Sequence, residues 1–484
     1  MSVAAGSSAP EPTLFVELEG TLLRTDLRVE SALVLIKRRP RMIVVVLLWL
    51  LRGRAHLEAQ IARRADIAPE TLVYDERLLV RLRAERERGR RLVLTTGSQG
   101  AYAEAIAQHL GLFDGVLASD ATRRLDGERK LESILAHTEG AAFDYAGSAA
   151  ADLPLWRKAR KAICVAAPAQ VVRALREFTE PEEIAPERRS YSRLLVRAVR
   201  VHQWLKNALV FVPIMAAHRI RDAGADLRVV AAVAAFCLCA SSVYVLNDLM
   251  DLRADRLHPR KRKRPFASGE VPLGHGLVLS PLLLAASAVL AALVLPRMFL
   301  IVLGAYYVSS IAYNFAAKEL AVWDVILLAG LYVLRVVAGA AAVPVPLSFW
   351  LLAFSGFVFL SLALAKRYSE MYTLHKLGRV QAHGRGYMTD DMPILQTMGV
   401  ASGYLAVLVM ALYINSPEIH NLYVRPYALW AICPLLMFWI SRIWVTTHRG
   451  QMHDDPVVFA LRDGVSLVIG ALTIACVVLG TLRI

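Results

Sequence analysis

The sequence predicts a protein of two parts: a soluble α/β domain over residues 13–180 and an all-α polytopic membrane bundle of nine transmembrane helices over residues 201–484. In the first part, short strand patterns alternate with charged helical stretches, which is typical of a parallel sheet covered by helices. In the second part, apolar runs long enough to cross a bilayer recur. The hydrophobic fraction of the chain, 56%, also exceeds that of ordinary soluble proteins.

The charge balance agrees with a membrane protein. The chain has 56 Lys and Arg against 41 Asp and Glu, a formal net charge of +15. In membrane proteins such an excess gathers in cytoplasmic loops that face anionic lipid. A basic chain can also bind nucleic acid, but no nucleic-acid-binding motif is recognisable, so we expect no nucleic-acid partner. The five cysteines form no Cys-x-x-Cys pair and are expected to be reduced.

The first part begins after residues 1–12, which are small and polar and are expected to be disordered. Four strand patterns follow, at residues 14–22, 91–98, 143–148 and 162–166. The stretch from Glu76 to Arg90, between the first two patterns, is charged and helical. Residues 181–200 are charged and irregular, and we interpret them as a linker with an amphipathic segment that approaches the membrane part.

The strand ends resemble the motifs of the haloacid-dehalogenase phosphatase family. That family opens with Asp-x-Asp-Gly-Thr, continues with a Thr or Ser at a strand end and a Lys, and closes with Gly-Asp-x-x-x-Asp. The matching positions here are Glu17, Glu19, Thr95, Lys130, Ser148 and Asp152. Three expected aspartates are therefore replaced. Because an aspartyl nucleophile must be held to a fraction of an ångström and glutamate is one methylene longer, we expect a phosphatase-like domain without catalytic activity.

Residues 42–51 form an apolar run with arginines on both sides. Ten residues are too few to span a membrane. Two interpretations remain open from the sequence. The run is either a buried cap helix of the first part, or a helix on the bilayer surface whose basic flanks meet lipid phosphates.

Nine apolar runs in the second part are long enough, or nearly so, to cross a bilayer, for which about 20 residues are needed. They lie at residues 207–217, 229–246, 276–295, 298–315, 321–343, 347–364, 395–413, 428–445 and 464–482. The loops after the second, fourth, sixth and eighth runs hold more Lys and Arg than the opposite loops. The positive-inside rule then predicts a multi-pass protein of the bacterial inner membrane, with its N-terminal domain in the cytoplasm and its C-terminus outside.

An acidic stretch, residues 247–255, follows the second run. On a helix, Asn247, Asp251 and Asp255 would share one face, with Asp248 beside them. Carboxylates this close repel one another unless a cation lies between them. Mg²⁺ prefers oxygen ligands and commonly bridges carboxylates to a substrate phosphate. The stretch therefore predicts a Mg²⁺–diphosphate site at the bilayer edge; the alternative is a solvated acidic helix end.

A basic segment, residues 258–269, comes next and includes Lys261, Arg262 and Arg264. Dense cations beside a metal site suit a polyanionic substrate. The alternative is a cytoplasmic loop whose charges only fix the orientation of the neighbouring helices. That alternative does not explain the acids beside them.

From about residue 195 to the end, the chain resembles the UbiA superfamily of intramembrane prenyltransferases. The resemblance rests on the Asn-Asp-x-x-Asp-x-x-x-Asp stretch after the second membrane helix and on Tyr313 and Lys318, which match a Tyr-x-x-x-x-Lys element. Typical members carry a second acidic cluster after the sixth helix, where this chain has Lys366 and Arg367. A cationic pair cannot bind Mg²⁺ but can bind a phosphate directly. This substitution is similar to the decaprenyl-phosphate phosphoribosyltransferase branch, as are residues 202–207, 335–339 and 454–456.

That branch implies a Mg²⁺-dependent transfer of a 5-phosphoribosyl group from phosphoribosyl diphosphate to a polyprenyl phosphate, at the cytoplasmic face of the membrane. In this reading the metal and the donor diphosphate are held by Asn247, Asp248, Asp251 and Asp255. The catalytic residues are Asp248, Asp251, Asp255 and Lys318. The donor is also bound by Lys261, Arg262, Arg264, Tyr313, Lys318 and Asp324. The lipid phosphate is bound by Lys206, Arg335, Lys366 and Arg367.

Two other functions stay open. An orthodox prenyltransferase would move a prenyl group from its diphosphate to an aromatic ring, but it predicts a second acidic cluster after the sixth helix. A membrane scaffold without enzymatic activity predicts eroded acids in the membrane part, whereas residues 247–255 retain theirs. The sequence leaves the prenyl length open, and it leaves a homo-oligomer open as well.

Overall fold

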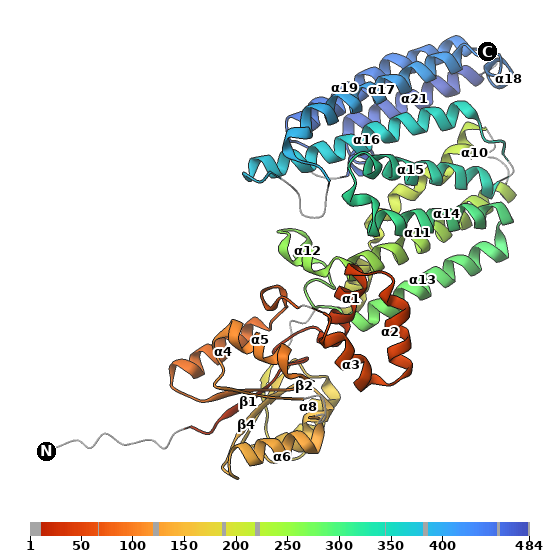
Figure 1. Ribbon diagram of the computed structural model, residues 1–484. Helices are drawn as coiled ribbons and strands as arrows, with labels where there is room; N and C mark the ends of the chain where they lie inside the picture. The colour runs from red at the N-terminus through yellow and green to blue at the C-terminus, as the bar shows by residue number, and fades with distance from the viewer. Residues whose placement is uncertain are drawn as a thin grey trace. The chain divides into compact units, whose positions relative to one another are not determined.

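The computed structural model describes residues 11–65, 67–119, 125–185, 190–217, 223–343, 345–380, 386–452 and 455–482 (Figure 1). Most of the segment expected to be disordered, residues 1–10, lies outside this set. The chain divides into two units: residues 1–198 with 245–278, and residues 199–244 with 279–484. The acidic stretch and the basic segment therefore belong to the same unit as the N-terminal domain. The expected domain division, with a single boundary near residue 200, would have placed them in the membrane part.

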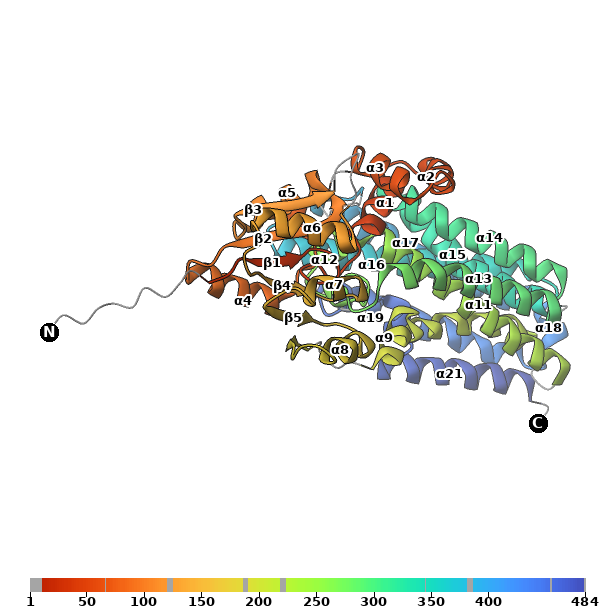
Figure 2. The same cartoon turned by 90° about the horizontal axis from the view of Figure 1, so that it is seen from below.

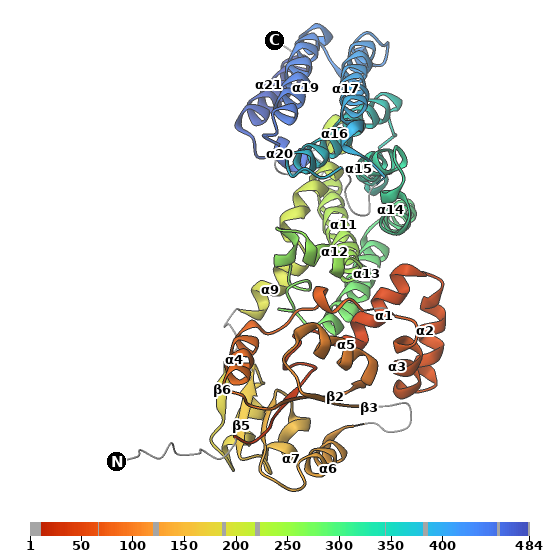
Figure 3. The same cartoon turned by 60° about the vertical axis from the view of Figure 1, so that its left-hand side comes forward.

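A six-stranded parallel sheet forms the first unit's centre, in the order β3-β2-β1-β4-β5-β6 (Figure 3). Its strands are β1 (Leu14–Glu17), β2 (Leu92–Gln99), β3 (Gly115–Ser119), β4 (Asp144–Gly147), β5 (Lys161–Val165) and β6 (Glu182–Ile184). In the central register Leu14 lies opposite both Leu92 and Asp144. The four expected strands correspond to β1, β2, β4 and β5.

Two strands were not expected from the sequence. The edge strand β6 lies inside the segment interpreted as a linker, and the other edge strand is β3. The sequence of β6, Glu-Glu-Ile, has no apolar alternation, because its side chains are largely exposed. Backbone hydrogen bonding to β5, and not a side-chain pattern, makes it a strand.

Helices cover both faces of the sheet, which confirms the α/β class. Along β1, Leu14 and Val16 point to one face and Phe15 to the other, as the two-residue period of a strand requires. On the first face lie α4 (Glu76–Glu87) and α5 (Gly100–Leu110). On the second face lie α6 (Gly127–His137), α7 (Leu153–Trp156) and α8 (Ala169–Arg176).

Three helices precede α4 in the segment between β1 and β2: α1 (Leu27–Arg38), α2 (Met42–Leu51) and α3 (Arg54–Ala62) (Figure 2). They pack together through a small cluster that includes Leu35, Ile61 and Trp49. No residue of α2 is buried. The interpretation of residues 42–51 as a buried cap helix is therefore wrong.

The second unit is helical. Eight helical segments of the chain, over the described residues, are long and apolar enough to cross a membrane: Asp226–Met250, Leu273–Val294, Arg297–Phe315, Trp323–Ala342, Phe349–Lys376, Thr389–Ile414, Pro426–His448 and Gly464–Thr481. They correspond to eight of the nine expected membrane helices and confirm a polytopic bundle. Two of them, α11 (Ala223–Met250) and α13 (Leu273–Val294), have their ends near the acidic and basic stretches in the first unit.

The first expected membrane helix, at residues 207–217, takes another form. It is a 3₁₀ segment, Val201–Phe211, followed by the short helix α10 (Val212–Ala216). Pro213 lacks a backbone N–H and so cannot lie inside a regular α-helix without losing a hydrogen bond. Because a 3₁₀ helix rises about 2.0 Å per residue, the two pieces together rise about 30 Å along their axes, which is about the hydrocarbon thickness.

Helix α15 (Trp323–Ala342) is the central element of the second unit. It contributes to two apolar clusters, one shared with α16 (Phe349–Lys376), α17 (Met392–Ile414) and α19 (Ile432–His448), and one shared with α11 and α14 (Arg297–Phe315). Figure 1 shows α15 between α14 and α16. More than half of its residues are buried. Charged residues on α15 therefore need partners from the surrounding helices.

Candidate functional site

The acidic stretch does not form one continuous helix. Helix α11 ends at Met250, Asp251 has a non-helical conformation with φ −100° and ψ 16°, and α12 (Leu252–Leu257) begins at the next residue. The expected common face of Asn247, Asp251 and Asp255 is therefore broken at its middle member. The break brings a different pair of acids together.

Asp248 and Asp255 converge on the guanidinium of Arg264. The Nη1 atom of Arg264 lies 3.1 Å from Oδ1 of Asp248 and also donates to Oδ2 of Asp255. Both carboxylates are buried, with 2% of each residue exposed. Burial raises the pKa of Asp255, and the nearby charge of Asp248 raises it further, against the opposing effect of Arg264. Two buried carboxylates thus share one cation.

Asp251 pairs with the N-terminal domain. The Nζ atom of Lys37, at the end of α1, lies 2.7 Å from Oδ1 of Asp251. Close by in sequence, Arg256 donates to both carboxylate oxygens of Glu30 on α1, at 2.5 and 3.0 Å. Arg256 also donates to the carbonyl of Thr71 at 3.0 Å. The acidic stretch is therefore held by contacts that no local sequence pattern indicates.

The donor set is chemically suited to a hard divalent cation. Asp248 and Asp255 both present an oxygen to the same nitrogen atom of Arg264, so the two carboxylates are close enough together to face one cation. Carboxylate oxygens are the ligands that Mg²⁺ prefers, and an Asn amide oxygen can complete such a set. Within the described residues, no group of three or more His, Cys, Asp or Glu is already arranged around a metal position. Asp251 is instead paired with Lys37.

In the second unit, two of the expected phosphate-binding lysines meet on one carboxylate. Oδ2 of Asp455 accepts hydrogen bonds from Nζ of Lys206 at 2.8 Å and from Nζ of Lys366 at 3.1 Å. The hydroxyl of Tyr332 donates to Oδ1 of Asp455 at 3.0 Å. Burial alone would raise the pKa of Asp455, but the two ammonium groups outweigh it and hold the pKa well below its usual range.

Asp455 was not among the expected site residues. It caps the short helix α20 (Pro456–Ala460) by accepting from the backbone N–H of Val457 at 3.2 Å. An Asp directly before a Pro is an ordinary helix start in sequence, so the residue carries a local signal for a cap but none for an ion pair. The preceding residue of the same motif, Asp454, lies outside the described residues.

Arg367 lies in a closed polar network, although it is adjacent to Lys366. It is fully buried and donates to Oδ1 of Asp324 at 2.9 Å, to Oε2 of Glu370 at 2.5 Å and to the hydroxyl of Tyr313 at 2.6 Å. The structure thus groups Tyr313 and Asp324, expected at the donor, with Arg367, expected at the lipid phosphate. Arg367 is better placed to orient these two side chains than to bind a phosphate itself.

Arg335 is likewise fully engaged within the bundle. It donates to Oδ1 of Asn207 at 2.9 Å, to the hydroxyl of Tyr306 at 2.9 Å and to the carbonyl of Leu331 at 2.6 Å. A buried Arg in a membrane helix is usually paired or functional. Here the pairing to α14 and to the 3₁₀ segment accounts for it, so a structural role fits Arg335 better than the expected contact with a lipid phosphate.

The other expected donor ligands lie on two short 3₁₀ turns, one in each unit. Lys261 and Arg262 are exposed on the 3₁₀ turn Lys261–Lys263 in the first unit. Lys318 is half-buried in the 3₁₀ turn Ala317–Glu319, between α14 and α15 in the second unit. The expected site residues are therefore divided between the two units.

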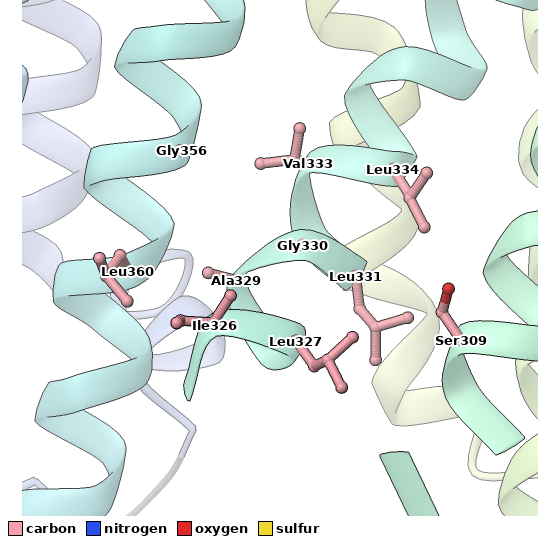
Figure 4. A pocket seen from close by; sticks show the side chains of 10 residues that line it. All are labelled: Ser309, Ile326, Leu327, Ala329, Gly330, Leu331, Val333, Leu334, Gly356 and Leu360. Carbon is pink, nitrogen blue, oxygen red and sulfur yellow. The ribbon is translucent and has the colours of Figure 1, made fainter. Parts of the chain in front are cut away.

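An apolar groove of about 440 Å³ runs beside the middle of α15 (Figure 4). Leu327, Leu331 and Leu334 of α15 line it, with Ser309 of α14 on one side and Leu360 of α16 on the other. Gly330 and Gly356 widen it because neither carries a side chain. A groove of this composition is suited to a hydrocarbon chain.

The side chains at the positions of the phosphatase-like motif lie close together and have hydrogen-bond partners within the domain. Glu17 accepts from Lys130 and from the hydroxyl of Tyr145 at 3.0 Å, and the same hydroxyl lies 3.0 Å from Oδ1 of Asp152. Oγ1 of Thr95 lies 3.5 Å from Oε2 of Glu17. Burial raises the pKa of Glu17 to about 6 in spite of Lys130. Because one hydroxyl has one proton, Tyr145 can donate to only one of the two carboxylates at a time.

The remaining motif positions also have internal partners. Ser148 accepts from the hydroxyl of Thr21 at 3.0 Å, and Glu19 accepts from Ser98 at 2.8 Å. Oδ2 of Asp152 accepts from the backbone N–H of Ser148 and of Ala149. Hydrogen bonds and close contacts link Glu17 with Thr95, Lys130 and, through Tyr145, Asp152, and Asp152 in turn contacts the backbone of Ser148. Tyr145 lies between the carboxylates of Glu17 and Asp152.

A family model described as "UbiA prenyltransferase family" matches residues 208–463. The chain belongs to the UbiA prenyltransferase family. A second model, described as haloacid dehalogenase-like hydrolase, matches residues 13–166, in agreement with the sheet and the motif positions of the N-terminal domain. The resemblances inferred for both parts of this UbiA protein are confirmed.

Three relatives show how far the likeness extends. An uncharacterized protein of Sinorhizobium fredii, y4nM, is 35% identical over 463 residues, 95% of this chain and 89% of its own length. The nodulation protein NoeC of Azorhizobium caulinodans is 39% identical over 273 residues, 56% of this chain and 88% of its own. The decaprenyl-phosphate phosphoribosyltransferase of Mycolicibacterium smegmatis is 38% identical over 215 residues, 43% of this UbiA-family chain and 67% of its own.

Proposed function

We propose that this UbiA-family protein transfers a 5-phosphoribosyl group from phosphoribosyl diphosphate to a polyprenyl phosphate, with Mg²⁺, at the cytoplasmic face of the inner membrane. The observation that carries the proposal is the pair Lys206 and Lys366 on Asp455. It provides two cations where an orthodox prenyltransferase needs acids for a second metal. Relatives named decaprenyl-phosphate phosphoribosyltransferase support the same reading.

The acidic stretch serves the donor. Asn247, Asp248, Asp251 and Asp255 would hold Mg²⁺, which supplies charge neutralisation for the departing diphosphate. In its absence Arg264 neutralises Asp248 and Asp255. When the donor binds, Arg264 is close enough to these acids to turn toward a donor phosphate, and the exposed Lys261 and Arg262 add positive charge nearby.

The lysine pair serves the acceptor. A phosphate monoester carries at least one negative charge, and it can take the place of Asp455 as a hydrogen-bond acceptor for one or both ammonium groups. Lys366 is the more accessible of the two, with 28% of its side chain exposed against 9% for Lys206. The apolar groove beside α15 gives the prenyl chain a hydrocarbon surface to follow.

The proposed transfer needs no strong general base, because the attacking oxygen is already anionic. An oxygen of the lipid phosphate, already anionic, attacks C1 of the ribose as the bond from C1 to the diphosphate oxygen breaks, and pyrophosphate leaves with both bonding electrons. Positive charge develops on the ribosyl carbon, as in other glycosyl transfers. Positioning and charge neutralisation then carry most of the rate enhancement. Arg367 would keep Tyr313 and Asp324 oriented for contacts to the donor, with Lys318 in the adjacent turn.

The proposal is tested with membranes that contain the full chain. They are incubated with phosphoribosyl diphosphate labelled in the ribose, polyprenyl phosphate and Mg²⁺, and the lipids are then extracted. We expect label in the lipid fraction only when all three components are present. Absence of label, with protein confirmed in the membrane, contradicts the proposal.

The two rival functions give different results in matched assays. An aromatic prenyltransferase transfers label from a prenyl diphosphate to an aromatic acceptor and leaves the ribose label in water. A scaffold transfers neither label. Label that reaches the lipid without added polyprenyl phosphate would point to another acceptor in the membrane.

A further inference from the structure

Helix α2 presents an apolar stripe to the outside of the N-terminal domain. Ile43, Val44, Leu47, Leu48 and Leu51 recur at the spacing of one helix face, and each is 49–84% exposed. The opposite face is the packed one. There Met42, Val46 and Trp49 contact α1 and α3. A stripe of five large exposed apolar side chains is unusual on a soluble surface.

Within its unit, α2 lies close in the chain to a residue that contacts the end of a candidate membrane span. Lys37, five residues before α2, is paired with Asp251, and Asp251 directly follows the end of a membrane-crossing helix at Met250. The pairing lies wholly within the first unit. The start of α2 is thus close, in the chain and in space, to the level at which a span leaves the bilayer.

The charges around α2 complement an anionic lipid surface. Arg39, Arg41 and Arg52 flank the helix and are exposed, and α2 itself carries no charge. Ten residues rise about 15 Å, half of the hydrocarbon thickness, so the helix cannot cross the bilayer. An apolar face between basic ends is the pattern of a helix that lies in the interface.

We propose that α2 is an interfacial anchor, which inserts its Ile43–Leu51 stripe into the cytoplasmic leaflet and binds lipid phosphates through the flanking arginines. The anchor would fix the N-terminal domain to the membrane at a point separate from the spans. The occupant of the stripe is the lipid bilayer. The proposal does not depend on the transferase activity.

The test uses the full chain reconstituted in vesicles of phosphatidylcholine and phosphatidylglycerol. Leu47→Cys, labelled with an environment-sensitive fluorophore, should show blue-shifted emission that acyl-chain-brominated lipid quenches. Val80→Cys is the matched control, since Val80 is 63% exposed on α4 of the same domain, and it should show neither change. Leu51→Cys, on the same stripe and 84% exposed, gives a second reading if the first variant folds poorly.

Two outcomes would overturn the anchor. Emission typical of water at both stripe positions would place α2 in solvent. Blue-shifted emission that brominated lipid does not quench would show that protein, either a partner or a second copy of the chain, covers the stripe.

A separate observation concerns the pair Glu30 and Arg256. Its side chains are 6% and 7% exposed, and it joins α1 of the N-terminal domain to the residue that follows Asp255. Arg256 has further acceptors in the carbonyls of Thr71 and Ala267, so all three of its nitrogens are engaged. A buried and fully satisfied pair of this kind fixes geometry more than it adds stability.

We infer that the N-terminal domain positions the acidic stretch for metal binding, with Glu30 as the positioning residue. This inference rests on the proposed function, because it takes the acidic stretch as the metal site. Residues that orient metal ligands through hydrogen bonds commonly change metal affinity when they are altered. The role would also explain why a domain with an altered phosphatase-like motif remains attached.

The experiment measures binding of Mn²⁺, as a stand-in for Mg²⁺, to the purified full chain by electron paramagnetic resonance. Glu30→Gln should weaken Mn²⁺ binding by about tenfold. Glu58→Gln is the matched control, because Glu58 pairs with Arg28 in the same helical insertion, at 3.3 Å, and has no contact with the acidic stretch among those described. It should leave the affinity unchanged.

The outcomes separate the two proposals. If the unaltered chain binds no Mn²⁺, the metal site itself is refuted. If it binds, and Glu30→Gln binds equally well, the positioning role is refuted while the site stands. The double variant Glu30→Gln/Arg256→Gln should bind no more weakly than the weaker single variant, and additive losses would show that the two residues do not act through each other.

Discussion

Single side chains in this protein do more than one task, and Asp455 is the clearest case. The same carboxylate caps a helix and neutralises two lysines. Neither lysine could be buried alone at low cost. A phosphate that displaced Asp455 would therefore find its binding cations already desolvated and held in place. Under the proposed function, a substrate phosphate would exchange with this contact, and a donor phosphate would do the same at Arg264 between Asp248 and Asp255.

The acids on Arg264 give the first prediction. Asp248→Asn and Asp255→Asn should each lower phosphoribosyl transfer by about two orders of magnitude or more, because each removes charge from the metal site. Label transfer to lipid at saturating Mg²⁺ is the measurement. Asp226→Asn provides a control on the first turn of the same helix, α11, and should retain activity. Full activity of either site variant would refute the metal assignment.

The lysine pair gives the second prediction. Lys366→Ala should raise the KM for polyprenyl phosphate by roughly tenfold, the cost of a lost charge-assisted hydrogen bond, and leave the KM for phosphoribosyl diphosphate almost unchanged. Steady-state kinetics in detergent check both values. Lys376→Ala, at the end of the same helix α16 and next to Tyr372, is the control. An effect on the KM for phosphoribosyl diphosphate alone would show that Lys366 binds the donor and not the lipid phosphate.

Among the secondary-structure elements, the interruption between α11 and α12 lies within the acidic stretch. The break between α11 and α12 separates Asp251 from Asp248 and Asp255, so one acid faces Lys37 while the other two share Arg264. In the sheet, β1 and β4 bring Glu17 and Tyr145 together at the strand ends. The result there is a group of carboxylates with internal hydrogen-bond partners, in which the pKa of Glu17 is raised.

The raised pKa of Glu17 predicts a pH dependence. The pKa is about 6 in the folded domain against 4.5 unperturbed, so between these values the folded state holds a proton that the unfolded state has lost. Stability conferred by that proton is present below about pH 4.5 and is lost as pH rises through about 6, by up to about 2 kcal/mol. Hydrogen exchange of the β1 amides in the full chain, corrected for intrinsic rates, should show weaker protection at pH 7 than at pH 5. Glu17→Gln should abolish this difference, and a difference that persists would assign it to another group.

The altered motif also predicts the absence of phosphatase activity. The full chain with Mg²⁺ and a phosphate monoester should show no turnover that depends on Glu17. Glu17→Asp should not restore turnover, because the Tyr145 hydroxyl still lies between the carboxylate positions. Turnover in the unaltered chain that Glu17→Ala removes would instead show a working phosphatase.

The whole molecule is a multi-pass membrane protein. Its N-terminal domain forms one unit with residues 245–278, in addition to being connected through the chain near residue 200. The ends of two membrane helices and the loop between them belong to the same unit as the N-terminal sheet. That domain and the loop must therefore lie on one side of the membrane. The positive-inside rule predicts that this side is the cytoplasmic one.

The last prediction follows from that assignment. In sealed vesicles of known orientation, Arg253→Cys in the loop and Val80→Cys in the sheet domain should react with a membrane-impermeant thiol reagent only from the cytoplasmic side. Tyr427→Cys, 82% exposed in the 3₁₀ segment Pro426–Ala431 at the start of the span that contains α19, should react only from the other side. Reaction of Arg253→Cys and Val80→Cys from opposite sides would contradict the two-unit organisation.

Local patterns in the sequence were enough to predict the classes of structure and the regions in which to search for function. Apolar runs identified eight span-length helices and strand patterns identified the four inner strands of the sheet. Charged motifs predicted Asp248, Asp255, Lys206 and Lys366 as site residues. These features depend on composition and on short periods, which are local properties of a chain. The strand β6 and the 3₁₀ form of residues 201–211 escaped this reading, because pairing and packing, not local pattern, decide them.

The pairing of charges with one another depends on the folded arrangement and is not visible in the sequence. Lys206 meets Asp455 across 249 positions of the chain, and Glu30 meets Arg256 across 226. Arg335 and Arg367, both expected at a phosphate, are instead enclosed by neighbouring helices. A buried charge takes as its partner whatever the fold brings within about 3 Å, and that choice depends on packing between elements that are remote in sequence.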